Sequence, residues 1–175
     1  MEVLIATGIM TTALVSLAQL FAVSTRANHQ SRNDTLSTVL AEQKMEQLRG
    51  LTWTLDANGI PVSDTSTDVS VSPESPTGGK GLNPSPAGVL GKNTPGYVDY
   101  LDQHGNWMGN GASPPNGTVY IRRWSLAASP DDPANVIILQ VLVTHRRDRG
   151  TADQGAVARL PHESRLVSVK VRRTT

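Results

Sequence analysis

The chain has 175 residues, a net charge of +1 and no cysteine. This length suits one domain of ordinary size plus an anchor. The lack of cysteine excludes disulfide scaffolds, thiolate zinc sites and cysteine nucleophiles. The near-neutral charge and the scarcity of aromatic residues make nucleic acid an unlikely partner.

The first predicted element is a membrane-length helix over residues 1–25. After Glu2 the chain carries no charge until Arg26, and it contains no proline over this stretch. Residues 3–25 as a helix span about 34 Å, close to the roughly 30 Å of a hydrocarbon core. The competing interpretation is a cleaved signal peptide, which requires a basic front and a shorter apolar core. We therefore predict a retained transmembrane helix.

The same helix is predicted to continue as an amphipathic segment over residues 26–51. No glycine lies between Gly8 and Gly50, and residues 35–51 are rich in helix formers. Gly50 is the expected C-cap. The alternative is a break in the polar stretch 28–34, which would leave two separate helices.

One face of this second half is apolar. Ala41, Met45 and Leu48 recur at i, i+4 and i+7, whereas Glu42 and Glu46 occupy the opposite face. Ala41, Met45 and Leu48 are therefore the residues expected to pack on the rest of the domain.

Residues 52–116 form a loop-rich region in which glycine and proline cluster. Two stretches within it, 68–72 and 97–101, have the pattern of strands. Asp99 and Asp102 lie near a glycine-containing turn and supply oxygen ligands of the kind that calcium prefers. Their spacing matches no defined calcium loop, so a solvated hairpin is the favoured interpretation.

Residues 117–175 are expected to form an antiparallel sheet, with strands at 118–127, 135–144 and 164–173. The first strand alternates, and its expected buried set is Val119 and Ile121, with Trp124 and Leu126 as further candidates. The second strand is continuously aliphatic, and the third alternates cleanly. A sheet with an apolar face needs a cover, and the amphipathic half of the helix is the available partner. The predicted fold is α+β: a long N-terminal helix packed on a C-terminal antiparallel sheet.

The sequence carries no pattern typical of an enzyme. The four histidines form no pair at metal-ligand spacing, and neither a Gly-x-Ser-x-Gly elbow nor a phosphate loop occurs. The basic stretches 122–123 and 145–147 are interpreted as solvated edge protection. We expect no catalytic activity, no metal and no cofactor.

The opening residues Met1-Glu2-Val3-Leu4-Ile5-Ala6, followed by Ala13-Leu14 and Leu17, resemble the N-terminal motif of the type IV pilin superfamily. Residues 40–49 are similar to the helix end of minor pilins of the PilV kind and of type II secretion pseudopilins of the GspI kind. The chain lacks the cysteine pair and the helix proline of many major pilins, which favours a minor subunit.

The resemblance implies a non-enzymatic filament subunit. Glu2 would pair with the N-terminal amine of a neighbouring subunit, and the helix would assemble through an apolar surface that includes Val3, Leu4, Ile5, Ala6, Leu14 and Leu17. It also implies a leader ahead of Met1 that a prepilin peptidase removes. The subunit would wait in the bacterial inner membrane, as a single span with its head in the periplasm or outside. It would then join other pilins or pseudopilins, at or near the filament tip.

The resemblance does not choose between a pilus and a secretion system. The alternative function is a single-span, membrane-anchored periplasmic β-domain that binds a ligand or partner outside any filament.

Overall fold

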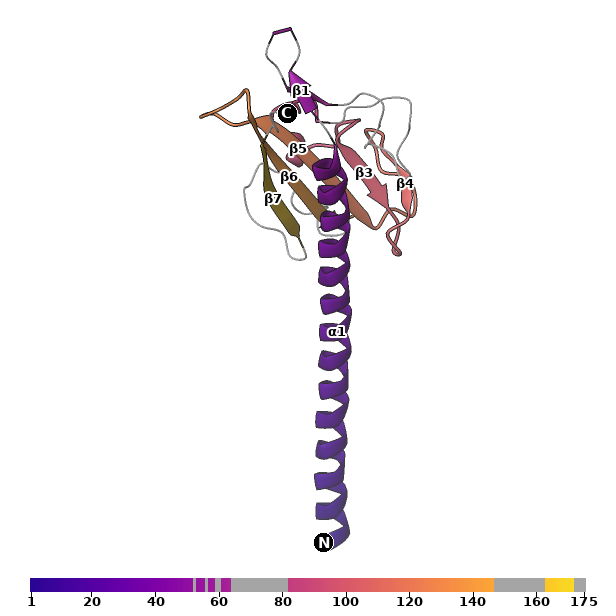
Figure 1. Ribbon diagram of the computed structural model, residues 1–175. Coiled ribbons are helices and arrows are strands. Elements are labelled where there is room, and N and C mark those ends of the chain that lie inside the picture. Colours follow the sequence, from indigo (N-terminus) through magenta and orange to yellow (C-terminus); the bar gives the residue numbers. More distant parts are fainter. Residues whose placement is uncertain (52, 56, 59–60, 64–81, 147–162, 172–175) are drawn as a thin grey trace. The chain divides into compact units, whose positions relative to one another are not determined.

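The computed structural model describes residues 1–51, 53–55, 57–58, 61–63, 82–146 and 163–171 (Figure 1). The chain divides into two compact units, Met1–Thr35 and Leu36–Thr175. The second unit is called the head below. The predicted strand at 68–72 lies outside the described residues.

Helix α1 runs from Glu2 to Gly50 without interruption. The break considered for residues 28–34 is absent: this stretch is helical throughout, and the Thr35 hydroxyl donates to the Ser31 carbonyl at 2.9 Å within the ladder. With no glycine or proline there to weaken the backbone ladder, polar side chains alone do not end a helix.

The main sheet has five antiparallel strands in the order β4-β3-β5-β6-β7. The strands are β3 (Val98–Leu101), β4 (Trp107–Gly109), β5 (Tyr120–Ala128), β6 (Val136–His145) and β7 (Ser164–Val171). A separate two-stranded ladder joins β1 (Trp53–Leu55) to β2 (Pro61–Ser63), and a short 3-10 turn, η1, spans Val89–Gly91. The predicted α+β fold, a long helix packed on an antiparallel sheet, is confirmed.

The loop-rich region contributes more to the sheet than its composition indicates. Strand β3 pairs with β5 over four residues, and β4 closes that edge of the sheet. Strand β5 begins two residues later than predicted because Thr118 belongs to the preceding turn. Its backbone amide and its hydroxyl both donate to the Pro115 carbonyl.

Register assigns the two faces of the sheet. On β5 the even-numbered residues face the helix side together with the odd-numbered residues of β6, since Arg122 pairs with Val143 and Trp124 with Val141. On β7 the helix-side residues are the even-numbered ones, because Leu166 pairs with Val141. The odd-numbered valines of β7 lie on the other face and are 58–62% exposed (Val167, Val169 and Val171).

The burial of β5 differs from the predicted pattern. Ile121 is buried, but Val119, which precedes the strand, is only partly buried, and the two arginines at 122 and 123 are each 1% exposed. Both faces of this strand are therefore covered, which alternation in a single strand does not reveal.

The turn between β3 and β4 fits closely against the helix. Gly105 there has φ of +84°, in the left-handed region that glycine adopts without strain. A Cβ at this position would lie 2.9 Å from Leu40 Cδ2. Glycine is thus required both by the backbone conformation and by the approach of the helix.

Candidate functional site

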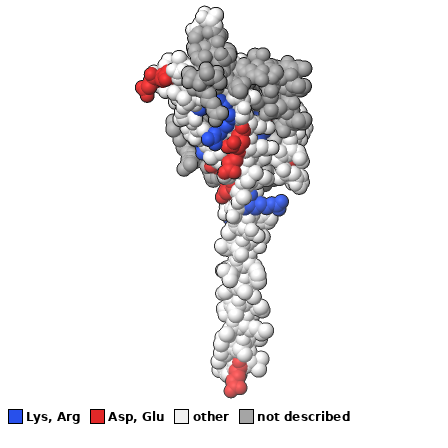
Figure 2. All heavy atoms as spheres, in the orientation of Figure 1, with Lys and Arg blue, Asp and Glu red and all other residues white. Residues whose placement is uncertain are grey.

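The apolar part of α1 presents a continuous hydrocarbon surface. Large apolar side chains from Val3 to Val23 are 49–76% exposed, and the helix is long and apolar enough to cross a membrane near the N-terminus. In Figure 2, the visible face of this helix has acidic atoms at its N-terminal tip and basic atoms nearer the head. The stretch between them shows no charged side chain. Such a surface is unfavourable in water and requires lipid or protein around it.

Four hydroxyl groups in this segment, between Thr7 and Ser16, are bonded within the helix itself. Each donates to a backbone carbonyl three or four residues earlier, at 2.5–3.2 Å (Thr7, Thr11, Thr12 and Ser16). Because these donors already have acceptors, they do not need water or a neighbouring polar group. Residues 7–16 therefore behave as apolar on every side, although they contain four hydroxyl residues in ten positions.

The residues expected to mediate assembly all lie in this segment. Glu2 is the first residue of α1 and the acidic group of its first turn, where the helix dipole favours a carboxylate. The apolar members of the set are all exposed (Val3, Leu4, Ile5, Ala6, Leu14 and Leu17). The sequence thus places one charge at the end of an otherwise uncharged surface.

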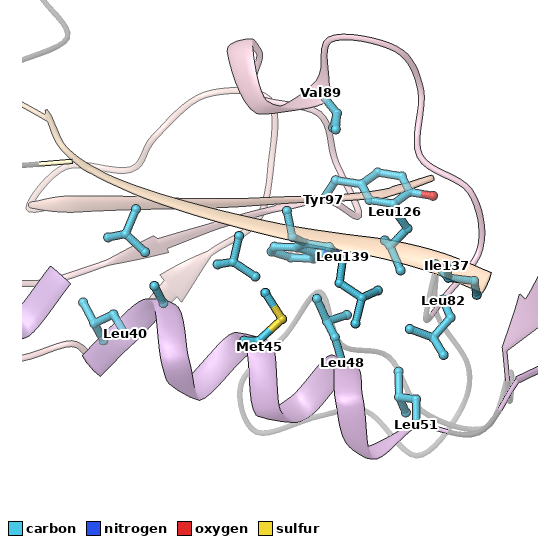
Figure 3. Close-up of a cluster of buried hydrophobic side chains, with 14 of the residues drawn as sticks. Leu40, Met45, Leu48, Leu51, Leu82, Val89, Tyr97, Leu126, Ile137 and Leu139 are labelled. Carbon is cyan, nitrogen blue, oxygen red and sulfur yellow. The ribbon is translucent and has the colours of Figure 1, made fainter. Parts of the chain in front are cut away.

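The second half of α1 supplies one wall of the head's core. Ala41 and Leu48 are fully buried, and Met45 is 5% exposed. Figure 3 shows Met45 and Leu48 pointing from the helix toward the sheet, where Leu139 is among the residues they face. These three helix positions are the ones expected to pack on the sheet.

A buried ion cluster lies at the same interface. Lys44 Nζ is 3.0 Å from Asp99 Oδ2, and Arg122 Nη2 is 2.8 Å from the same oxygen. Arg122 Nε also donates to that oxygen, at 3.1 Å. All three side chains are at most 1% exposed. Two cations thus share one carboxylate, so these three side chains together carry one excess positive charge.

Aromatic and helical groups surround this excess charge. Lys44 Nζ lies 4.3 Å from the ring centroid of Trp124, within the range of a cation–π contact. Arg122 Nη1 donates to the Leu40 carbonyl at 3.2 Å and to Gln43 Oε1 at 3.3 Å. Arg122 on β5 therefore binds a backbone carbonyl of the helix directly. It is also linked to Lys44 of the helix through the carboxylate of Asp99 that both contact.

Sequence reasoning placed Asp99 wrongly and overlooked Lys44. Both cations hold the Asp99 carboxylate, so it is not a free calcium ligand, and that part of the calcium hypothesis fails. Lysine is usually solvated, so composition alone gives no reason to place Lys44 in the core. It lies four residues from both Leu40 and Leu48, at the centre of the apolar face, and that spacing is the signal that could have revealed it.

Asp102 organises a turn instead of presenting ligands. Its Oδ1 accepts from the amides of His104 and Asn106, at 2.7 and 2.9 Å, and its Oδ2 accepts from Asn106 Nδ2 at 2.9 Å. Hydrogen bonds from the Asn106 side chain and backbone lower the pKa of Asp102. Within the described residues, no three His, Asp or Glu side chains are grouped to hold a metal ion.

The helix ends at Gly50, but not through the predicted glycine cap. Gly50 is the last helical residue and does not have a left-handed φ. Instead, the Lys170 ammonium group on β7 donates to the Arg49 and Leu51 carbonyls. A cation placed on terminal carbonyls satisfies acceptors that the helix leaves open and opposes the negative end of its dipole.

The long N-terminal helix and the antiparallel sheet are compatible with a pilin-like fold. Comparisons of the chain with protein-family models, with curated proteins and with solved structures find no match.

Proposed function

We propose that the chain is a structural subunit, a minor pilin or pseudopilin, that assembles through its N-terminal helix at or near the tip of a type IV pilus or type II secretion pseudopilus. The observation that carries the proposal is α1 itself. One uninterrupted helix is a bare hydrocarbon surface in its first half and a core element of the head in its second.

The exposed surface supports this function energetically. Burying one large aliphatic side chain is worth about 1.5–3 kcal/mol, and residues 3–25 expose many of them. A membrane covers this surface before assembly, and helices of neighbouring subunits cover it afterwards. The internally bonded hydroxyls favour both environments because neither has to supply a polar partner.

Glu2 gives the assembly its register. A carboxylate surrounded by hydrocarbon is expensive unless it is paired, and the free amine of a neighbouring subunit is a suitable cation. A buried pair of this type contributes specificity more reliably than stability. We therefore assign Glu2 to alignment of the helix in the filament.

The test is the incorporation of full-length variants into filaments sheared from bacteria that assemble them. Glu2→Ala should remove the protein from the sheared fraction and leave its amount in the inner membrane unchanged. Glu42→Ala, which removes an exposed carboxylate from the head half of the same helix, is the matched control and should be incorporated normally. Normal incorporation of Glu2→Ala would refute the assembly role and leave the single-span anchored domain as the better account.

A second measurement identifies what the helix touches. A photo-reactive amino acid at Leu14 should cross-link to other subunits in sheared filaments, because this side chain lies on the apolar surface. The same group at Val39, which is 52% exposed on the head half of α1, should give a different set of adducts. Adducts at Leu14 with lipid alone, in every fraction, would contradict assembly.

A further inference from the structure

A pocket of about 330 Å³ opens on the head beside β5. Its wall includes Ile121 and Arg123, which belong to the face of the sheet opposite the helix, together with Lys92, Asn93 and Arg146. This volume is at the lower end of the range of small-molecule sites. Three of the five side chains named are cationic.

Arg122 and Arg123 of β5 differ in the groups that surround their guanidinium charges. Because side chains alternate along a strand, Arg122 faces the helix and is paired with Asp99. Arg123 faces the pocket. Both are 1% exposed, so each guanidinium has lost nearly all of its water, but among the described residues a counterion is found for Arg122 and not for Arg123.

Neutral oxygens are the acceptors of Arg123. Its Nε donates to the Lys92 carbonyl and to Asn93 Oδ1, both at 3.1 Å, and Nη2 donates to the same Asn93 oxygen. Nη1 reaches Thr144 Oγ1 only at 3.5 Å. These bonds fix the orientation of the guanidinium and leave part of its five-donor capacity unused. They do not neutralise its charge.

Among the described residues, no carboxylate forms an ion pair with the other two cations of the pocket. Lys92 and Arg146 are exposed, and Arg146 Nη1 donates to the Pro115 carbonyl at 3.3 Å. Within the described part of the head, the ion pairs of Asp and Glu involve Lys44, Arg49, Arg122 and Arg165 instead. A buried cation normally has an anionic partner. The pocket has three positive charges around one opening and no resident anion among these residues.

We propose that this pocket binds a small phosphate-bearing ligand. A phosphate dianion matches several cations better than a single carboxylate does, and a guanidinium presents the fork of donors that phosphate oxygens accept. The apolar wall at Ile121 suits the carbon skeleton of a phosphate ester. The inference is independent of filament assembly, since every residue that it uses belongs to the head.

The test is titration of the full-length protein in non-ionic detergent micelles with inorganic phosphate and, separately, with glycerol 3-phosphate. Binding is measured by calorimetry against sodium chloride of equal ionic strength. Both anions should bind saturably. Tighter binding of glycerol 3-phosphate would identify an ester as the ligand, and equal binding would identify phosphate itself; either result supports the pocket.

Variants at the rim keep the test independent of folding. Lys92→Gln and Arg146→Gln change exposed side chains, so the head should remain folded; each should weaken phosphate binding about threefold, and the double variant about tenfold. Arg165→Gln removes an exposed cation from β7, outside the pocket, and should leave the affinity unchanged.

Two results would overturn the proposal. One is the absence of saturable binding above the chloride control. The other is an affinity that the double variant leaves unchanged or that Arg165→Gln lowers equally, since either would show only general attraction to a charged surface.

Discussion

Replacing Asp99 by asparagine should destabilise the head far more than replacing Lys44 by methionine. Asp99 is the anion that two buried cations share, at 3.0 Å from Lys44 and 2.8 Å from Arg122. Asp99→Asn removes the carboxylate that both buried cations contact. Lys44→Met removes one cation and leaves a neutral Asp99–Arg122 pair, while a side chain of similar length fills the space beside Trp124.

The magnitudes follow from what each variant leaves behind. Breaking a buried ion pair by removal of one partner costs about 3–5 kcal/mol, and Asp99→Asn should reach the upper part of that range because two cations are affected. Lys44→Met loses an ion pair and a cation–π contact but also removes the excess positive charge, so its cost should be about 1 kcal/mol or less. For a unit of this size, a difference of 3 kcal/mol corresponds to roughly 10 °C in Tm.

The assay is urea and thermal unfolding of the full-length protein in detergent, followed by tryptophan fluorescence. Trp124 is a suitable reporter because it is fully buried beside Lys44. Leu142→Ala, a truncation on the other face of the sheet, controls for general damage to the core. Equal destabilisation by Asp99→Asn and Lys44→Met, or a larger effect of Lys44→Met, would refute the assignment of Asp99 as the shared counterion.

Three further expectations concern the head. Leu48→Ala should lower the free energy of unfolding by about 2–5 kcal/mol through a core cavity, whereas Val39→Ala on the exposed side should change it by less than about 0.5 kcal/mol in the same urea titration. Lys170→Met should cost about 1 kcal/mol through loss of its bonds to the helix-end carbonyls, and hydrogen exchange should then increase in the last turn of α1. Hydrogen bonds from Asn106 lower the pKa of Asp102 in the folded state. The contribution of Asp102 to stability is therefore complete above its unfolded pKa and disappears as pH falls through its folded pKa. Carbon NMR titration should find that folded pKa below 3.8.

The sequence predicted the helix and the long strands well because local patterns determine them. The uncharged run, the lack of proline and the absence of glycine between Gly8 and Gly50 define α1 within one residue at each end. The aliphatic run of β6 and the alternation of β7 identify these strands regardless of their neighbours. Such elements can be recognised from patterns that lie within each segment of the sequence.

The ion cluster and the basic pocket could not be predicted in the same way. Lys44, Asp99 and Arg122 are far apart in the sequence and meet only through the register of β3 with β5 and the docking of the helix. Alternation places Arg122 and Arg123 on opposite faces, but it does not show that both faces are covered. Strands β1, β2 and β4 have three residues each, too few for a period to be recognised.

The internally bonded hydroxyls have a consequence for how the helix chooses its neighbours. A helix with one polar stripe has a preferred rotation about its axis, because that stripe seeks water or a partner. Residues 7–16 have no such stripe, so the solvation free energy of this stretch in lipid would depend little on rotation about the axis. In the proposed assembly, the side of this stretch that meets a neighbour would then be selected by shape, such as the small surface at Gly8, and by the charge at Glu2. Substituting Gly8 by a bulky aliphatic residue would preserve hydropathy and change only the contour of the helix, which separates shape from polarity as the determinant of its orientation.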